Sequence, residues 1–177
     1  MTGDIETWRR RGEAARLAHE AVNAAFAAHV REREREPDRY DALLAHFRDK
    51  TAAALPSSDG AFIPGLAAGN ARAIETGIAF LEADPWFFRS GYEKQNIIRH
   101  LKRAQLDDAQ RMRLARVVLH AIDSRDRVEF RHFGRLACGV WSDFLDEEVA
   151  NRMQSADPGI RRRAIWVAEA AISAGKA

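Results

Sequence analysis

Apolar residues recur at intervals of three and four along most of the chain, the spacing that places them on one face of an α-helix. Over residues 4–36 the apolar positions are Ile5, Trp8, Ala15, Ala18, Val22, Phe26 and Val30. A second helix is predicted at 38–54, with Tyr40, Leu43, Leu44 and Phe47 on its apolar face. Pro37 is expected to end the first helix. No stretch predicts a strand, so the pattern indicates an all-α protein.

Residues 56–65, PSSDGAFIPG, are rich in residues that favour turns. They form the clearest internal boundary of the chain. We therefore expect an N-terminal helical hairpin at 1–56 and a second helical region at 66–177, within one continuous domain. A chain of 177 residues is long enough to bury one sizeable core.

From Gly69 onward the pattern predicts three pairs of helices: 70–83 with 86–104, 106–124 with 127–139, and 141–156 with a helix after 157. An aspartate stands at the turn inside each pair, where an N-cap is needed. These are Asp84, Asp126 and Asp157, and proline follows the first and the last of them. Pairs of helices repeating at intervals of 42 and 31 residues are typical of an α-solenoid.

The stretch ANRMQSADPGIRRRAIWVAEA, residues 150–170, resembles a HEAT-type repeat. It has the Asp-Pro turn after an apolar helix, then an aliphatic and a basic residue, then alternating small and large apolar positions. The residues that carry this resemblance are Asp157, Ile160, Arg161, Ala164 and Val167. The stretches around Asp84 and Asp126 fit less well, because the first has aromatic residues at the diagnostic positions and the second lacks the proline. Over residues 70–175 the resemblance implies stacked helical hairpins in a short solenoid, which the N-terminal hairpin would cap.

The composition is that of a globular protein, with 46% hydrophobic and 31% charged residues and a net charge of only +2. The basic residues are 24 arginines and 4 lysines. They are unevenly distributed, because residues 89–135 hold twelve of them against six acids, a local charge of +6. A region with this excess is expected to attract phosphate groups or an acidic protein surface.

Several of these arginines fall on shared helix faces. Arg89, Asn96, Arg99 and Arg103 lie along one face of a predicted helix, Arg127, Arg131 and Arg135 along another, and Arg162 extends the pattern into the third pair. If the second helices of the pairs line the inside of the curve, the rows merge into one basic concave surface. Two other interpretations remain open: the arginines could pair with groups of the neighbouring helix pair, or form a plain solvated face. Arg161, Arg162 and Arg163 cannot act together, because successive helical residues point about 100° apart.

The aromatic residues Trp86, Phe87 and Phe88 follow one another, with Tyr92 one turn later. Three successive helical residues cannot all enter one core, so at least one is expected at a seam or on the surface. We select Trp86 as a candidate partner-binding residue, because aromatic residues beside arginine are typical of interface hot spots. A wide buried helix between two pairs is the alternative interpretation.

The sequence offers no recognisable catalytic or metal-binding set. Cys138 is the single cysteine, and the six histidines show no spacing of three or four. Nucleotide-binding and nucleophile motifs are absent, so we expect no cofactor and no metal. No stretch approaches the roughly 18 apolar residues of a membrane span, and acidic residues near the N-terminus argue against a targeting peptide. We therefore expect a cytoplasmic protein.

These features predict a non-enzymatic helical-repeat module that binds a protein partner, as an adaptor, an inhibitor or immunity-type factor, or an assembly partner. The alternative is nucleic-acid binding through the basic concave face. Some HEAT-like proteins of similar size are DNA glycosylases, and Trp86, Trp166 and Asp143 are conceivable in such roles without support from their spacing.

Overall fold

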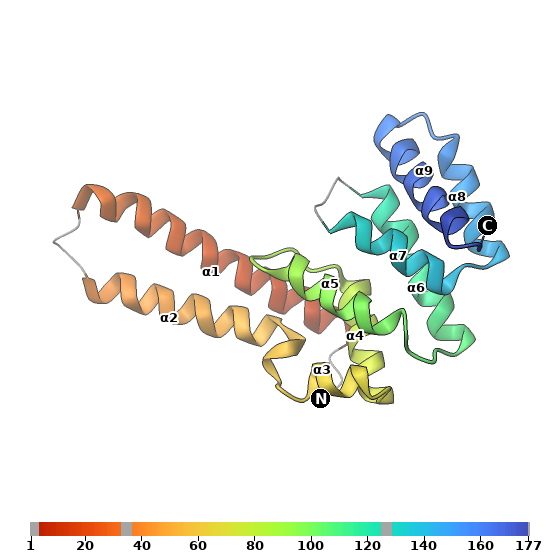
Figure 1. The fold of residues 1–177 in the computed structure, drawn as a ribbon. Helices are drawn as coiled ribbons and strands as arrows, with labels where there is room; N and C mark the ends of the chain where they lie inside the picture. The colour runs from red at the N-terminus through yellow and green to blue at the C-terminus, as the bar shows by residue number, and fades with distance from the viewer. Residues whose placement is uncertain (1–3, 33–36, 125–128, 177) are drawn as a thin grey trace.

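The computed structural model describes residues 4–32, 37–124 and 129–176, and every regular element in these ranges is helical (Figure 1). The elements are α1 Ile5–Glu32, α2 Pro37–Ala54, the short 3₁₀-helix η1 Pro56–Ser58, α3 Phe62–Ala67, α4 Ala71–Ala83, α5 Ser90–Leu101, α6 Asp108–Asp123, α7 Phe130–Val140, α8 Asp143–Met153 and α9 Pro158–Ser173. The prediction of an all-α protein is confirmed. Within the described ranges, no helix combines the length and the hydropathy that crossing a membrane requires.

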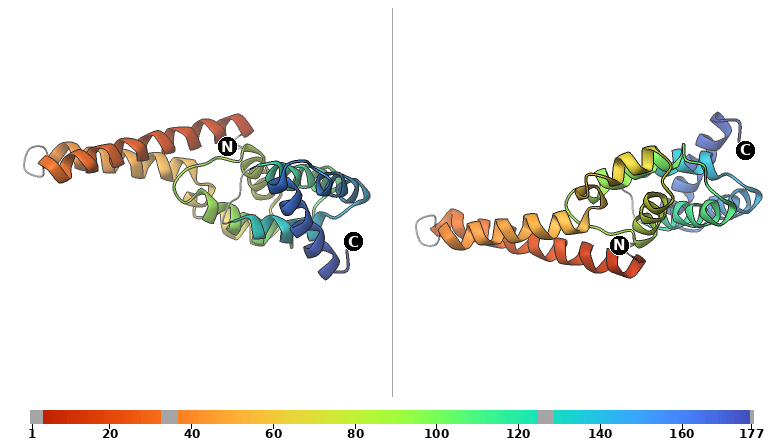
Figure 2. Two further views of the ribbon diagram at one scale, coloured as in Figure 1. Left: turned by 90° about the horizontal axis from the view of Figure 1, so that it is seen from above. Right: turned by 90° about the horizontal axis from the view of Figure 1, so that it is seen from below.

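Helices α1 and α2 pack side by side and project from the rest of the molecule as a long arm (Figures 1 and 2). The N-terminal part of α1 lies against α4 and anchors the arm. There Trp8 packs edge-on against Phe80, with 5.5 Å between the ring centroids. Pro37 begins α2, at the position where its missing N–H costs nothing.

The remaining long helices form two layers. Helices α4, α6 and α8 follow one another in one layer, and α5, α7 and α9 in the other. Helices α5 and α7 of the second layer run in the same direction. Near the start of both helices, a Cβ at Gly91 would lie 3.2 Å from the Glu129 carboxylate. Near the end of both helices, a Cβ at Gly139 would lie 3.6 Å from Lys102. Helix α7 therefore packs on α5 without reversal of direction.

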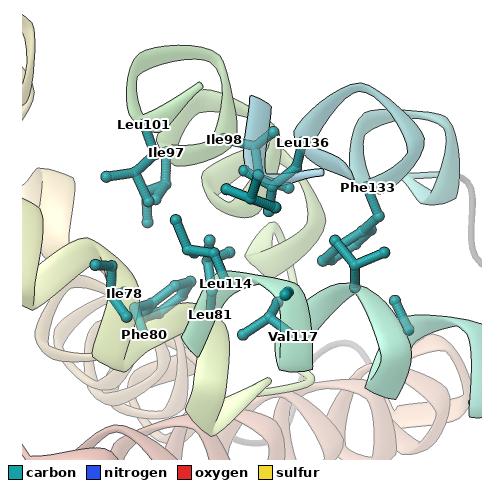
Figure 3. Close-up of a cluster of buried hydrophobic side chains, with 14 of the residues drawn as sticks. Ile78, Phe80, Leu81, Ile97, Ile98, Leu101, Leu114, Val117, Phe133 and Leu136 are labelled. Carbon is teal, nitrogen blue, oxygen red and sulfur yellow. The ribbon is translucent and has the colours of Figure 1, made fainter. Parts of the chain in front are cut away.

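The hydrophobic core lies between the two layers (Figure 3). Ile78 and Phe80 of α4 and Leu114 of α6 are fully buried on one side. Ile97 of α5 and Leu136 of α7 are fully buried on the other side. Figure 3 shows side chains of the two layers pointing toward one another across this space. The helical spacing of apolar residues in the sequence corresponds to this shared core.

Residues 56–65 hold more structure than their composition indicates. η1 occupies their first three positions, and α3 begins at Phe62. Phe62 and Leu66 of α3 are buried in the core. The turn residues of this segment therefore connect two short helices, and α3 packs against the hydrophobic core.

The aspartate at the last turn acts as predicted. Asp157 is the N-cap of α9, where its carboxylate accepts hydrogen bonds from the backbone N–H groups of Gly159 and Ile160, 2.7 and 3.1 Å away. Pro158 is the first residue of the helix. The same backbone hydrogen bonds hold the pKa of Asp157 below its usual value.

The prediction for the first turn is wrong. Asp84 is the C-cap of α4 and has left-handed backbone angles, with φ of 46°, so it does not cap the following helix. Asp126 lies outside the described residues, and Glu129 holds the N-cap position of α7 without a side-chain bond. The three aspartates therefore do not occupy equivalent helix-capping positions, and the intervals of 42 and 31 residues between them are not the period of a repeat.

Candidate partner-binding surface

The segment between α4 and α5 is held in a strained conformation. Asp84 and Arg89, at its two ends, both have positive φ, 46° and 71°. Such angles are costly for residues other than glycine and occur mostly where the surrounding structure enforces them. Here the Asp84 carboxylate lies 2.6 Å from the ammonium of Lys94, a fully buried side chain of α5, and 3.5 Å from His120 Nε2 of α6. Three helices therefore fix the start of the segment.

This segment holds aromatic side chains at the surface. The predicted helix over residues 86–89 is wrong, because α5 begins only at Ser90. Phe87 turns inward and is 7% exposed, whereas Trp86 is 58% and Phe88 50% exposed. The backbone approaches α1 so closely that a Cβ at Gly12 would lie 2.6 Å from the Cβ of Pro85. The exposed aromatic rings thus sit on a segment that packing and an ion pair both restrain.

A groove of about 730 Å³ lies beside this segment, between α2 and α5. Phe47 of α2 and Phe88 line it, with 5.9 Å between their ring centroids. His19 of α1 stacks on Phe47 and lies at a tilt to Phe88. Thr51 lines the groove and has a buried hydroxyl without a hydrogen-bond partner among the described residues. Tyr92, 74% exposed, lines the α5 wall. The groove therefore combines apolar rings with polar groups, as ligand sites commonly do.

The accessible charges of the groove are positive. Arg48 of α2 and Arg89 and Arg99 of the α5 side line it. Its one carboxylate, Glu93, is 6% exposed and accepts hydrogen bonds from the backbone N–H and the hydroxyl of Ser57, both 2.7 Å away. An occupant would therefore meet guanidinium groups and aromatic rings, and no accessible carboxylate from the groove residues.

A second group of cations surrounds His132 on the neighbouring helix. Arg131 and Arg135 lie one turn apart on α7, and the charges of Arg99 on α5 and of Lys102, the residue that follows α5, also act on the imidazole of His132. His132 is 8% exposed, and its Nε2 accepts a long hydrogen bond of 3.4 Å from Arg131. Burial lowers the pKa of His132, and the four positive charges lower it further. We call these five residues the His132 cluster.

In the described parts of the chain, two arginines of the layer formed by α4, α6 and α8 are bound to carboxylates, unlike the arginines of the groove. Arg113 of α6 donates to Glu82 and Glu75 of α4 over 2.7–2.8 Å, and its bond to Glu75 lowers the pKa of that carboxylate. Arg152 of α8 is likewise bound to Asp123 of α6 at 2.8 and 2.9 Å. Arg113 and Arg152 therefore each bond to the preceding helix of this layer.

The structure brings some of the predicted site residues together. Arg89, Asn96 and Arg99 line the groove, and the charges of Arg99, Arg131 and Arg135 all act on His132. Within the described part of the chain, neither the Arg89 nor the Arg131 side chain bonds to a carboxylate or carbonyl of a neighbouring helix pair.

Other predicted residues lie apart from this group. Trp86 is exposed on the strained segment and does not line the groove, and Arg103 is exposed beyond the end of α5. Arg162 is exposed on α9, where its guanidinium lies 5.3 Å from the ring of Trp166. Arg127 lies outside the described residues.

Several residues of this surface were not selected from the sequence, among them Phe47, Arg48, Lys102 and His132. Arg48 and Phe47 belong to the N-terminal hairpin, and no local pattern connects them to α5. Lys102 follows Arg99 by three residues, and His132 directly follows Arg131. The i, i+3 spacing of Arg99 and Lys102 is the one sequence signal by which Lys102 could have been selected as a site residue.

The buried imidazole predicts a loss of stability in acid. Because the pKa of His132 is lower in the folded chain than its unfolded value of about 6.5, the unfolded state binds more protons in this range, so stability decreases as the pH falls through about 6.5. We expect His132→Gln to reduce the fall in melting temperature between about pH 7.5 and pH 5.5. Thermal unfolding at the two pH values measures this, and an unchanged fall in the variant would contradict it.

The described residues contain no group of three or more histidine, cysteine or acidic side chains placed to hold a metal ion. The surface instead offers exposed rings, a groove and accessible guanidinium groups, which are the means of binding a ligand or partner. The chain matches no protein-family model, no curated protein and no solved structure, so its function is inferred from this geometry alone.

Proposed function

We propose that this protein is a non-enzymatic binding module for an acidic protein partner, built as a short HEAT-like solenoid behind an N-terminal hairpin. The parallel stacking of α5, α7 and α9 supports the solenoid. Phe130 faces Trp166 at 6.1 Å, and a Cβ at Gly134 would lie 3.6 Å from that of Ala170. Both pairs are 36 positions apart, a period within the range of helical-repeat proteins.

One observation carries the binding function: exposed aromatic rings are held by a strained segment, beside groove arginines that have no acidic partner among the described residues. Exposed Trp86 and Phe88 cost solvation free energy, and the positive φ angles of Asp84 and Arg89 cost conformational free energy. Tryptophan, tyrosine and arginine are the residues most enriched at interface hot spots. A partner with acidic and apolar side chains would bury the rings and neutralise the guanidinium groups.

Affinity capture from an extract of the source cell tests this proposal. We expect the wild-type protein to retain a specific acidic protein, and Trp86→Ala to reduce retention by about 30-fold or more, the effect of a hot-spot truncation. Arg116→Ala is the matched control, because Arg116 is exposed on α6 in the opposite layer. Equal retention by all three proteins, with circular dichroism confirming their folds, would refute the proposal.

The His132 cluster favours nucleic-acid binding as a second candidate, because its cations would suit phosphate groups. If a duplex were the ligand, retention on a short DNA would fall steeply between low and moderate salt. The double variant Arg99→Glu with Arg131→Glu would then abolish retention. Unchanged retention of the double variant would eliminate this candidate.

A further inference from the structure

The two walls of the groove between α2 and α5 are joined by contacts at two places. The rings of Phe47 and Phe88 lie 5.9 Å apart, measured between their centroids. Further along the chain, the backbone N–H and the hydroxyl of Ser57 both donate to the carboxylate of Glu93 over 2.7 Å. The groove that these residues line has a volume of about 730 Å³, within the roughly 300–1,000 Å³ of small-molecule sites. The two contacts fix the walls of a cavity of this size.

Thr51 gives the groove a buried polar group that lacks a partner. It lies between Phe47 and Ser57 along the chain, lines the groove and is 9% exposed. A helical threonine can donate to the carbonyl four residues earlier, but the hydroxyl of Thr51 has no hydrogen-bond partner among the described residues. A buried polar group left in this state costs stability. An oxygen atom of a ligand in the groove would satisfy this hydroxyl.

The charge of the groove favours an anion. Arg48, Arg89 and Arg99 line it and are exposed, and none of them has an ion pair or a hydrogen bond among the described residues. Arg48 precedes Thr51 by three positions, so the two side chains are neighbours on one face of α2. Guanidinium groups bind carboxylates through paired, charge-assisted hydrogen bonds. One carboxylate could therefore bind Arg48 and the hydroxyl of Thr51 together.

We propose that the groove is a binding site for a small organic acid, in which one carboxylate is attached to an aromatic or aliphatic body. The carboxylate accepts hydrogen bonds from Thr51 and Arg48, and the body packs against Phe47, Phe88 and Leu55, which also line the groove. A purely polar anion would leave these apolar side chains uncovered, and a neutral apolar molecule would leave the guanidinium groups unpaired. The inference goes beyond the proposed function, because this ligand is a small molecule that binds without the protein partner.

Isothermal titration calorimetry of the isolated protein tests the site, with 4-phenylbutyrate as the probe. Two reference compounds each lack one half of it: 4-phenylbutan-1-ol has the same body without the charge, and butyrate has the carboxylate without the ring. We expect saturable binding of 4-phenylbutyrate at one site. Each reference compound should bind at least about tenfold more weakly, because it loses either the charge-assisted hydrogen bonds or the buried ring.

Two substitutions with matched controls locate the binding. Thr51→Val keeps the shape of the side chain and removes the hydroxyl, and Arg48→Gln removes the charge. Each should weaken binding of 4-phenylbutyrate about tenfold, the effect of losing one hydrogen bond to a charged group. Thr76→Val on α4 and Arg116→Gln on α6 make the same chemical changes outside the groove and should leave binding unchanged.

Thr51→Val also has an opposite effect on the unliganded protein. Because the variant removes a buried hydroxyl without a partner, we expect its melting temperature to equal or exceed that of the wild type. Weaker binding by an equally stable variant assigns the hydroxyl to the ligand. A lower melting temperature would mean that the hydroxyl is satisfied within the protein, and the inference would then be wrong.

Three binding results would also overturn the inference: no saturable heat with 4-phenylbutyrate, equal affinity for the alcohol, or equal weakening by the control variants. Saturable binding of a peptide that ends in Glu-Phe, without binding of 4-phenylbutyrate, would replace the small acid by a chain terminus of the protein partner. The titration needs no partner, and Trp86 does not line the groove. A failure of partner capture and a failure of acid binding are therefore separate outcomes.

Discussion

Replacing Lys94 by methionine is expected to lower the free energy of unfolding by about 3–5 kcal/mol, the cost of breaking a buried ion pair from one side. Lys94 is fully buried, and its ammonium lies 2.6 Å from the carboxylate of Asp84, whose side chain is 13% exposed. Methionine keeps much of the apolar stem, so the loss would come from the charge. His120, 3.5 Å from the other oxygen of Asp84, is 63% exposed and screened by water. Urea unfolding measures the change directly.

A double variant separates the charge from the packing. Asn in place of Asp84 removes the stranded carboxylate and tolerates the left-handed backbone. We expect Lys94→Met with Asp84→Asn to be more stable than Lys94→Met alone by about 1–3 kcal/mol, as for coupled neighbours. Lys50→Met, at an exposed position of α2, should change stability by less than about 0.5 kcal/mol. If Lys94→Met were no worse than Lys50→Met, the ion pair would not hold the segment.

The same substitution connects stability to binding. Asp84 begins the strained segment that displays Trp86 and Phe88, so its release would let the segment relax. We therefore expect Lys94→Met to weaken partner capture even at a temperature where the protein remains folded.

Helix positions were predictable because the chain repeats apolar residues at helical spacing around one core. The boundaries of α2, α4 and α6 and the start of α9 lie within two residues of the predicted ones. The short helix α3 was not predicted, because it buries just two of its six residues, Phe62 and Leu66. Six residues give too little periodicity to distinguish a helix from a loop.

The two Asp-Pro pairs show where local pattern fails. Asp84-Pro85 and Asp157-Pro158 have the same letters, and the second begins a helix as expected. The first instead follows the end of α4, because Lys94 binds its carboxylate. That partner lies ten residues away in sequence and on another helix, so no capping rule could identify it.

The candidate surface was predictable only within single helices. Helical spacing placed Arg131 and Arg135 on one face, and parallel packing places α5, which carries Arg99, beside α7. The groove could not be predicted, because Arg48 reaches it from the N-terminal hairpin. Relative placement of α2 and α5 depends on tertiary packing that one sequence does not reveal.

The three consecutive arginines of α9 occupy three different environments. Arg161 donates to the carbonyl of Ser155 at 2.6 Å, and Arg162 lies over the ring of Trp166; both are exposed. Arg163 is 5% exposed, and its Nε donates to the carbonyl of Ile122 at 2.7 Å. That carbonyl belongs to the last turn of α6, where no intrahelical donor is available. Arg163 therefore caps α6 and links it to α9.

Arg163→Ala is expected to lower the free energy of unfolding by about 2–4 kcal/mol, because it removes a charged donor and the buried apolar stem together. Arg162→Ala should cost at most about 1 kcal/mol, the contribution of an exposed cation–π contact. Urea unfolding of the two variants compares them in the same helix and with the same chemical change. Equal losses would mean that Arg163 does not cap α6. A loss confined to Arg163→Ala would assign this arginine to the stacking of helix pairs and leave Arg162 as part of the surface.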